Sequence, residues 1–435
     1  MSLLAAMNTA ISGLGAQSDA FGNISDNVAN SQTVGYKRAD TAFTDFLTSS
    51  SASNNNPGSV VAKPTYRNAV QGTIGQSDNP LSMAITGQGL FAVSRQNGTA
   101  SGAVTFSTQN YYTRVGDFGM DKNGYVVNSA GDFLKGWAVN STTGVINRTT
   151  MAPIQITKTV YNPVATSEVT LSANLPATPA SGSTQTAQVD VYDALGTPHT
   201  VTLNWTLTSA NLWSVAVESG DDVTATARGI ANVTFGATSG NPVAEGTIGL
   251  VGSGSGSVVP GSYVAGAAAT LTFDTDFGQG AQTITLNLGS YGGSSGVTQY
   301  AGTSFALRGI TQDGVPPGSF SSVTTNQSGD IQVNYDNGQA RVIARAPVVT
   351  FNNPNELQRQ DGQAFTATNG SGAALAQDAG SNGAGGLVVQ SVEQSNVDIA
   401  SEFSKLIVAQ RAYSANTKMV TTAYELLQQT IDMKR

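Results

Sequence analysis

The sequence predicts a mainly β protein with α-helical termini, in which an N-terminal and a C-terminal helix pair as a coiled-coil-like stalk. Three observations predict this fold. Apolar residues recur every three or four positions at both ends of the chain. Short alternating strands with turn signals fill the middle. Two Gly- and Ser-rich polar segments separate the middle from the ends. We therefore expect a discontinuous inner β-domain with an inserted outer β-domain.

The N-terminal helix is predicted from apolar or small residues with the spacing of a heptad seam. Gly13, Gly15 and Gly22 each cost about 1 kcal/mol relative to alanine inside a helix. This helix therefore needs a packing partner to be stable. The seam consists of Leu4, Met7, Ile11, Leu14, Ser18, Phe21, Ser25 and Val28.

The C-terminal helix is predicted from a longer seam of the same spacing, and Ser395 with Asp398 fits a capping box at its start. At 1.5 Å per residue, each helix would be a rod of roughly 40–55 Å. The two helices either pair within one chain or become ordered when neighbouring subunits supply the partner surface. The second seam consists of Ile399, Phe403, Leu406, Gln410, Tyr413, Thr417, Val420, Tyr424, Leu427 and Ile431.

The middle of the chain reads as β-structure. Asn123-Gly124 and Asn337-Gly338 are two-residue turn signals between predicted strands, and the polar stretch 48–58 is predicted to be a mobile loop. The predicted organisation is terminal helices at 1–33 plus 395–435, flexible linkers at 34–71 plus 366–394, an inner β-domain at 72–163 plus 306–365, and an inserted outer β-domain at 164–305.

Composition excludes several classes of function. The 435 residues contain no cysteine and one histidine, so thiolate metal sites, disulfides and multi-histidine metal sites are excluded. The net charge of −8, without basic runs, argues against nucleic-acid binding. No apolar run approaches the roughly 18 residues that span a membrane. Residues 1–36 lack the Lys or Arg of a secretory signal. We expect no cofactor, no metal, and no nucleic-acid or membrane partner.

Two glycine motifs resemble enzyme signatures but lack the required context. Gly87-Gln88-Gly89-Leu90-Phe91-Ala92 fits a dinucleotide-binding pattern, yet a strand-like segment follows it, so we expect a tight turn between strands. Gly292 to Gly296 fits G-x-S-x-G, but no helix follows. His199 begins a predicted strand and has no accompanying motif. We therefore expect no catalytic residue and no enzymatic activity.

Both ends carry motifs of one family. Residues 29–37 contain Ala29, Asn30, Thr33, Gly35, Tyr36 and Lys37, and resemble the A-N-x-x-T-x-G-[FY]-K motif of bacterial flagellar rod and hook proteins. The segment Ser395-Asn396-Val397-Asp398 resembles the start of the same family's C-terminal helix. The segment Ala409-Gln410-Arg411-Ala412-Tyr413 resembles its centre.

Interior segments extend this resemblance. Residues 72–94, 112–137 and 318–365 resemble the β-domain that these axial proteins share. Residues 191–205 resemble the start of the outer domain of the hook proteins, whereas about 209–305 show little likeness. The insertion favours the hook proteins over the rod proteins. Alternatives are a distal rod or hook–filament junction protein of the same family, or an extracellular β-rich adhesin, which would not need paired terminal seams.

The resemblance implies a structural subunit that self-assembles into a curved, flexible hollow tube, the universal joint that transmits torque from the motor and rod to the filament. The terminal helices would form the inner tube. The implied partners are further copies of the chain, the distal rod, the hook cap, the hook–filament junction proteins and the flagellar export apparatus. The implied location is the flagellar hook and basal body outside the cell, after export without a cleaved signal peptide.

Overall fold

The fold is taken from a computed structural model, which describes residues 3–51, 54–100, 103–140, 143–179 and 182–433. It divides into two compact units, each described here by itself. The terminal unit holds both chain ends and comprises Met1–Lys158, Ser321–Asn334 and Ala340–Arg435. The inserted unit comprises Thr159–Phe320 and Tyr335–Gln339. The predicted class, mainly β with helices at both ends, is confirmed.

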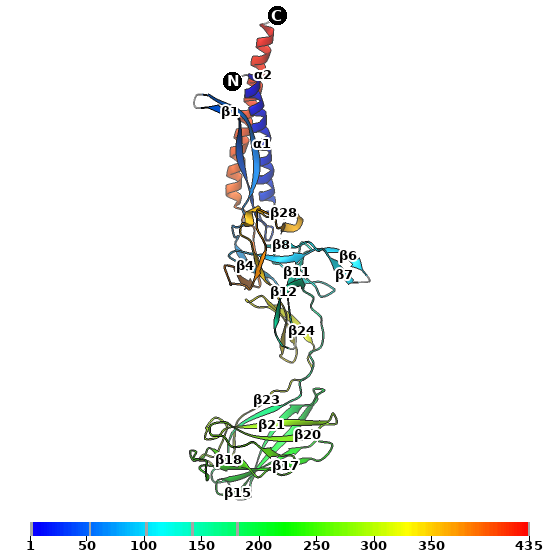
Figure 1. Ribbon diagram of the computed structural model, residues 1–435, viewed down its shortest axis with the longest axis vertical. Coiled ribbons are helices and arrows are strands. Elements are labelled where there is room, and N and C mark those ends of the chain that lie inside the picture. The colour runs from blue at the N-terminus through cyan, green and yellow to red at the C-terminus, as the bar shows by residue number, and fades with distance from the viewer. Residues whose placement is uncertain (1–2, 52–53, 101–102, 141–142, 180–181, 434–435) are drawn as a thin grey trace. The chain divides into compact units, whose positions relative to one another are not determined.

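The terminal helices α1 (Leu3–Ala29) and α2 (Ile399–Asp432) lie side by side and antiparallel (Figure 1). Their direction follows from contacts that run in opposite order: Asn27 bonds to Glu402, and Phe21 meets Tyr413. Small residues allow the helices to approach closely. The buried alanines of the pair are Ala10, Ala16, Ala20, Ala409 and Ala423.

A long hairpin, β1 (Ala39–Ser51) with β2 (Asn54–Tyr66), follows α1 and packs against it. Thr9 Oγ1 donates to the Gly58 carbonyl at 3.1 Å, and the Val60 N–H donates to Ser12 Oγ at 3.1 Å. The expectation of a flexible linker at 34–71 with a mobile loop at 48–58 is therefore wrong for the described residues. Residues 52–53 lie outside the description.

The β-part of the terminal unit is built on a 13-stranded sheet with short strand pairs beside it. The sheet contains β5 (Leu90–Ser94), β8 (Tyr111–Thr113), β9 (Gly119–Met120), β10 (Val126–Val127), β11 (Phe133–Val139), β12 (Ile146–Pro153), β24 (Phe320–Thr325), β25 (Asp330–Tyr335), β26 (Ala340–Arg345), β27 (Val348–Thr350), β28 (Gln358–Gln360), β29 (Ala364–Thr366) and β30 (Leu375–Gln377). The pairs are β3 (Ile74–Gln76) with β32 (Ser391–Glu393), β4 (Met83–Thr86) with β31 (Gly386–Val389), and β6 (Gln96–Ala100) with β7 (Ala103–Phe106). Two 3-10 turns are η1 (Pro354–Glu356) and η2 (Asp361–Gln363).

This pairing corrects the second predicted linker. Three strands, β30, β31 and β32, lie within 366–394 and pair with β27, β4 and β3. Both predicted turns are confirmed: Asn123-Gly124 lies between β9 and β10, and Asn337-Gly338 lies between β25 and β26.

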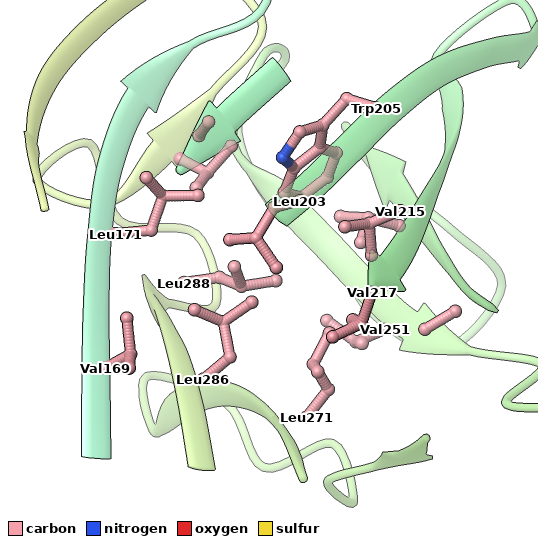
Figure 2. Close-up of a cluster of buried hydrophobic side chains, with 14 of the residues drawn as sticks. Val169, Leu171, Leu203, Trp205, Val215, Val217, Val251, Leu271, Leu286 and Leu288 are labelled. Atoms are coloured by element: carbon pink, nitrogen blue, oxygen red, sulfur yellow. The ribbon is translucent and has the colours of Figure 1, made fainter. Parts of the chain in front are cut away.

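The inserted unit is a sandwich of two sheets around one apolar core. In Figure 2, Leu171, Leu286 and Leu288 of one sheet face Leu203 and Val215 of the other. Alternate residues of these strands are buried, as the two-residue period of a strand requires. One sheet contains β13 (Glu168–Asn174), β19 (Val259–Pro260), β20 (Ala268–Asp276), β21 (Ala281–Ser290), β22 (Val297–Thr298) and β23 (Ala306–Gln312). The other contains β14 (Thr184–Tyr192), β15 (Pro198–Ser209), β16 (Leu212–Ser219), β17 (Ala227–Phe235) and β18 (Ile248–Gly252).

The inserted unit is larger than the predicted outer domain of 164–305. Its main segment runs from Thr159 to Phe320, because β23 pairs with β13 and the isolated bridge of Val164 with Val315 lies beside it. Residues 306–320, which the sequence assigned to the inner β-domain, therefore belong to the inserted unit.

Candidate assembly surface and the junction behind it

The N-terminal motif forms the turn that joins α1 to the β-part. Gly35 has a φ of +70°, in the left-handed region, and its N–H donates to the Glu393 carbonyl at 2.8 Å. A Cβ atom at Gly35 would lie 2.7 Å from the Val115 backbone nitrogen, so a side chain has no room there. Asn30 and Thr33 bond to each other across the turn at 3.2 Å. The motif thus fixes the direction in which the chain leaves α1.

Tyr36 connects this turn to the last part of α1. Its hydroxyl donates to Asp26 Oδ2 at 2.9 Å and lies 3.1 Å from Asn27 Oδ1. The Arg359 guanidinium lies 4.6 Å from the Tyr36 ring centroid. Burial raises the pKa of Tyr36 to about 12, with Arg359 opposing the rise and Asp26 adding to it. The phenol therefore stays protonated well above its usual range.

We expect this tyrosine to weaken the fold in alkali. An unfolded tyrosine ionises near pH 10 and the folded Tyr36 near pH 12, so the stability that Tyr36 supplies is complete below pH 10 and lost as pH rises towards 12. The measurement is the difference in unfolding free energy between the wild type and Tyr36→Phe across this range. The ionisation of the other tyrosines affects both proteins equally and therefore does not contribute to this difference. A difference that stays constant with pH would contradict the prediction.

Lys37 completes the motif in a buried ion cluster. Its Nζ donates to Glu393 Oε1 at 2.6 Å and to the Val70 carbonyl at 2.6 Å. Arg114 donates to the other oxygen of Glu393 and to the Ile85 carbonyl at 2.6 Å. The carboxylate of Glu393 is fully buried. Burial lowers the pKa of Lys37, and Glu393 partly offsets this effect.

The C-terminal motif fastens the start of α2 to the same region. Asn396 Oδ1 accepts from the Arg38 N–H at 2.8 Å, and its amide nitrogen donates to the Val70 carbonyl at 3.0 Å. The N-cap of α2 is Asp398, which accepts from the N–H groups of Ala400 and Ser401 at 2.9 and 3.2 Å. The predicted capping box is therefore wrong, because the acid caps the helix itself. Ser395 Oγ instead accepts from the Val397 N–H at 3.3 Å.

A second polar group joins the two helices to the hairpin. The buried Glu402 accepts from Asn27 at 3.0 Å and from Lys405 at 2.6 Å. Lys405 also donates to Asp40 of β1 at 2.7 Å, and Arg67 donates to the same carboxylate at 2.8 Å. Burial alone would raise the pKa of Asp40, but these two cations hold it below its usual value. Helices and hairpin are thus held in one register.

Of the predicted seams, Phe21 of α1 and Tyr413 of α2 meet across the helix pair, with their ring centroids 6.2 Å apart. The other seam side chains are half-buried or exposed, whereas Ala20 of α1 and Ala409 of α2 are buried. Half-buried positions are Met7, Leu14, Phe21, Val28, Leu406, Val420 and Leu427. Exposed positions are Leu4, Ile11, Ile399, Phe403, Gln410, Tyr413, Tyr424 and Ile431.

Small residues lie where α1 and α2 approach most closely. The heptad pattern of large apolar residues did not predict these positions. A Cβ at Gly13 would lie 2.9 Å from the Asn416 side chain, which shows how close the helices come. In the second motif, Ala409 is buried and Ala412 is half-buried, whereas Arg411 is exposed. The alanines spaced by four in α1 were the available signal for this face.

The residues considered as enzyme signatures have structural surroundings. Gly87 and Gly89 lie in the turn between β4 and β5, as expected, and their carbonyls accept from Arg114. His199, in the inserted unit, stacks on Phe277 at 3.9 Å between ring centroids and lies 3.0 Å from Asp221 Oδ2. Among the described residues, no group of three or more potential ligands is placed to hold a metal ion. The described helices are not long and apolar enough to cross a membrane.

Four family models match successive parts of the chain. They are "Flagella basal body rod protein" at 7–37, "Flagellar hook protein FlgE/F/G D1 domain" at 84–174, "Flagellar basal body protein FlaE D2 domain" at 156–315 and "Flagellar basal body rod FlgEFG protein C-terminal" at 388–433. Together with the paired terminal helices and the inserted β-sandwich, these matches define an axial protein of the bacterial flagellum.

Comparison with individual proteins shows which flagellar axial proteins this chain resembles over its whole length. The flagellar hook protein FlgE of Brucella abortus is 30% identical over 439 residues, which cover 100% of both chains. That of Salmonella typhimurium is 28% identical, over 98% of this chain and 99% of its own. The chain belongs to the flagellar hook protein FlgE family and is a structural subunit of the hook. The crystal structure of the Helicobacter pylori hook protein FlgE2 matches with a TM-score of 0.49 and 14% identity, over 72% of this chain and 98% of that chain.

Proposed function

We propose that this hook subunit polymerises through the exposed faces of α1 and α2, which form the inner wall of a hollow, curved and flexible tube. The tube acts as the universal joint that carries torque from the rod to the filament. The observation that carries the proposal is the exposure of α2. This helix has 34 residues, of which Glu402, Ala409 and Ala423 are buried.

Large apolar side chains on this helix support the same conclusion. Phe403 is 51% exposed, Tyr424 64% and Ile431 58%. Large apolar side chains exposed at several points along one helix favour an interaction site over a surface that faces solvent alone. Full burial of each side chain would contribute about 1.5–3 kcal/mol. Because α1 already occupies the side of α2 that carries the buried alanines, the remaining faces of α2 are left for other subunits.

The junction gives these faces a fixed relation to the β-part of the terminal unit. The ion cluster of Glu393 and the capped start of α2 tie both helices to this β-part, so a load on the helices reaches the sheets through buried polar contacts. This suits a subunit with a mechanical role and no enzymatic one. The proposal extends to the distal rod, hook cap and hook–filament junction proteins as neighbours in the flagellum, and to the flagellar export apparatus as the route outside.

The test compares exposed apolar residues in the two units. Phe403→Ser with Tyr424→Ser is expected to leave the subunit folded, because both side chains are exposed, and to abolish polymers in sedimentation and electron microscopy. The matched control is Leu195→Ser with Val259→Ser in the inserted unit, which are 61% and 59% exposed. Polymers that form equally well in both double variants would contradict the proposal.

A further inference from the structure

We propose that α1 of one subunit docks antiparallel on α2 of a second copy of this chain, with an acidic stripe against a basic stripe. The acidic stripe of α1 is Leu4, Asn8, Ile11, Gly15, Asp19, Gly22 and Asp26. The basic stripe runs along α2 to its C-cap, Met433, and consists of Arg411, Ala415, Lys418, Thr422, Leu426, Gln429 and Met433. This inference rests on the proposed polymerisation and names the surfaces that pair.

Each stripe lies on one side of its helix and is exposed in the described part of the chain. The steps between successive members are three or four residues, which places them on one helix face. All fourteen side-chain positions are exposed. The contact between α1 and α2 in one chain uses the other side of each helix, where Gly13 approaches Asn416 and Asn27 bonds to Glu402.

The charges on the two stripes are complementary. Asp19 and Asp26 are the charged residues of α1, whereas the basic stripe carries Arg411 and Lys418. Within the described chain, none of these four side chains forms an ion pair, although Asp26 accepts hydrogen bonds from Tyr36 and Asn30. Each pair of like charges is seven residues apart, about 10 Å along a helix. Two ion pairs can therefore form at once.

One antiparallel register satisfies every position of the two stripes. Setting Asp19 opposite Lys418 also sets Asp26 opposite Arg411. The same register brings together the exposed apolar pairs Leu4 with Met433 and Ile11 with Leu426, and the amides of Asn8 and Gln429. It sets Gly15 and Gly22 opposite Thr422 and Ala415. A shift by seven residues in one direction would put Asp19 against Glu425, and a shift in the other direction would put Asp26 against Ser404. Of these registers only the proposed one forms both ion pairs, so charge favours it.

The antiparallel direction follows from the helix pair itself. Because α1 and α2 run in opposite directions within one chain (Figure 1), α1 of any subunit is antiparallel to α2 of every similarly oriented neighbour.

The glycines of the acidic stripe are explained by this contact. Gly15 and Gly22 each lower helix stability by about 1 kcal/mol relative to alanine. Neither has any heavy atom of the described chain within 4 Å of where a Cβ would lie. Packing within the subunit therefore does not require them, whereas a second helix could approach closely over both.

The decisive experiment reverses one charge on each stripe of the full-length chain. Asp19→Lys and Lys418→Asp are each expected to raise the critical concentration for polymerisation, measured by sedimentation, by about tenfold or more, because like charges then face each other. The double variant Asp19→Lys/Lys418→Asp restores the pair and is expected to return to near the wild-type value. Lys122→Asp, an exposed change in the turn before β10, is the matched control.

A second variant separates docking from folding. Gly22→Leu has space within the subunit and favours the helix, so the melting temperature of the monomer should hold or rise while polymers disappear. Gly309→Leu, at a glycine that also has nothing within 4 Å, is its control. If wild type polymerises and the charge variants and Gly22→Leu match it, the inference is overturned and the proposed function stands. If wild type stays monomeric at all concentrations, the proposed function itself fails.

Discussion

Replacing Glu393 with glutamine is expected to lower the free energy of unfolding of the terminal unit by about 3–5 kcal/mol. Glutamine keeps the size of the side chain but removes its charge, so Lys37 and Arg114 remain buried without a counter-charge. The N–H of Gly72, which donates to Glu393 Oε1 at 2.7 Å, also depends on this carboxylate. Native-state hydrogen exchange measures the effect, with faster exchange expected at the start of α2 and unchanged exchange in β15 of the inserted unit.

A matched ion pair provides the control for Glu393. Asp378 pairs with Arg148 at 3.0 Å and with Arg345 at 3.2 Å, but its side chain is 32% exposed. Asp378→Asn should therefore lower stability by about 1 kcal/mol or less. Equal losses in Glu393→Gln and Asp378→Asn would show that burial of the ion cluster does not set its contribution.

Replacing Trp205 with alanine is expected to destabilise the inserted unit by about 3–5 kcal/mol. The indole is fully buried between the two sheets, where it lies near Leu203 and Val215 (Figure 2). The loss should appear as earlier melting and faster exchange in β15 and β16, while α1 and α2 keep their protection. A uniform loss across both units would instead show that they unfold together.

A conservative variant of the same tryptophan tests the origin of this loss. Trp205 Nε1 is buried and has no hydrogen-bond partner among the described residues. Trp205→Phe removes this unsatisfied donor while retaining an aromatic ring, so part of the lost packing is offset. Trp205→Phe should therefore lower the free energy of unfolding much less than Trp205→Ala does. An equal cost in both variants would contradict this account.

The sequence was sufficient for the class of the fold and for the motifs at its ends. Heptad spacing located both helices, and two-residue period located the strands of the sandwich. Periodicity could not tell which helix face contacts the partner helix of the same chain. The sequence left open whether Phe403 and Tyr424 pack within the chain or against neighbouring subunits. In the structure both side chains are exposed, whereas Ala409 and Ala423 of the same helix are buried.

The hairpin β1–β2 was missed for a different physical reason. Its polar, Ser- and Asn-rich tip has weak strand propensity, and a two-stranded hairpin alone is marginally stable. Contacts with α1 supply the remaining stability. Ser12 bonds to Val60 at 3.1 Å, and Asn23 bonds to Thr41 at 2.8 Å. Such tertiary contacts between distant residues leave no local pattern. The sequence pattern did not predict the role of Glu393 for the same reason, because its partner Lys37 is 356 residues away along the chain.

The position of the inserted unit within the chain has an evolutionary consequence. Residues that form the helix pair and the ion cluster lie on both sides of the main inserted segment, which runs from Thr159 to Phe320. Lengthening, shortening or exchanging that sandwich alters neither the pairing of α1 with α2 nor the partners of Glu393. The sandwich can therefore diverge in sequence and length during evolution while the terminal unit keeps the same internal contacts.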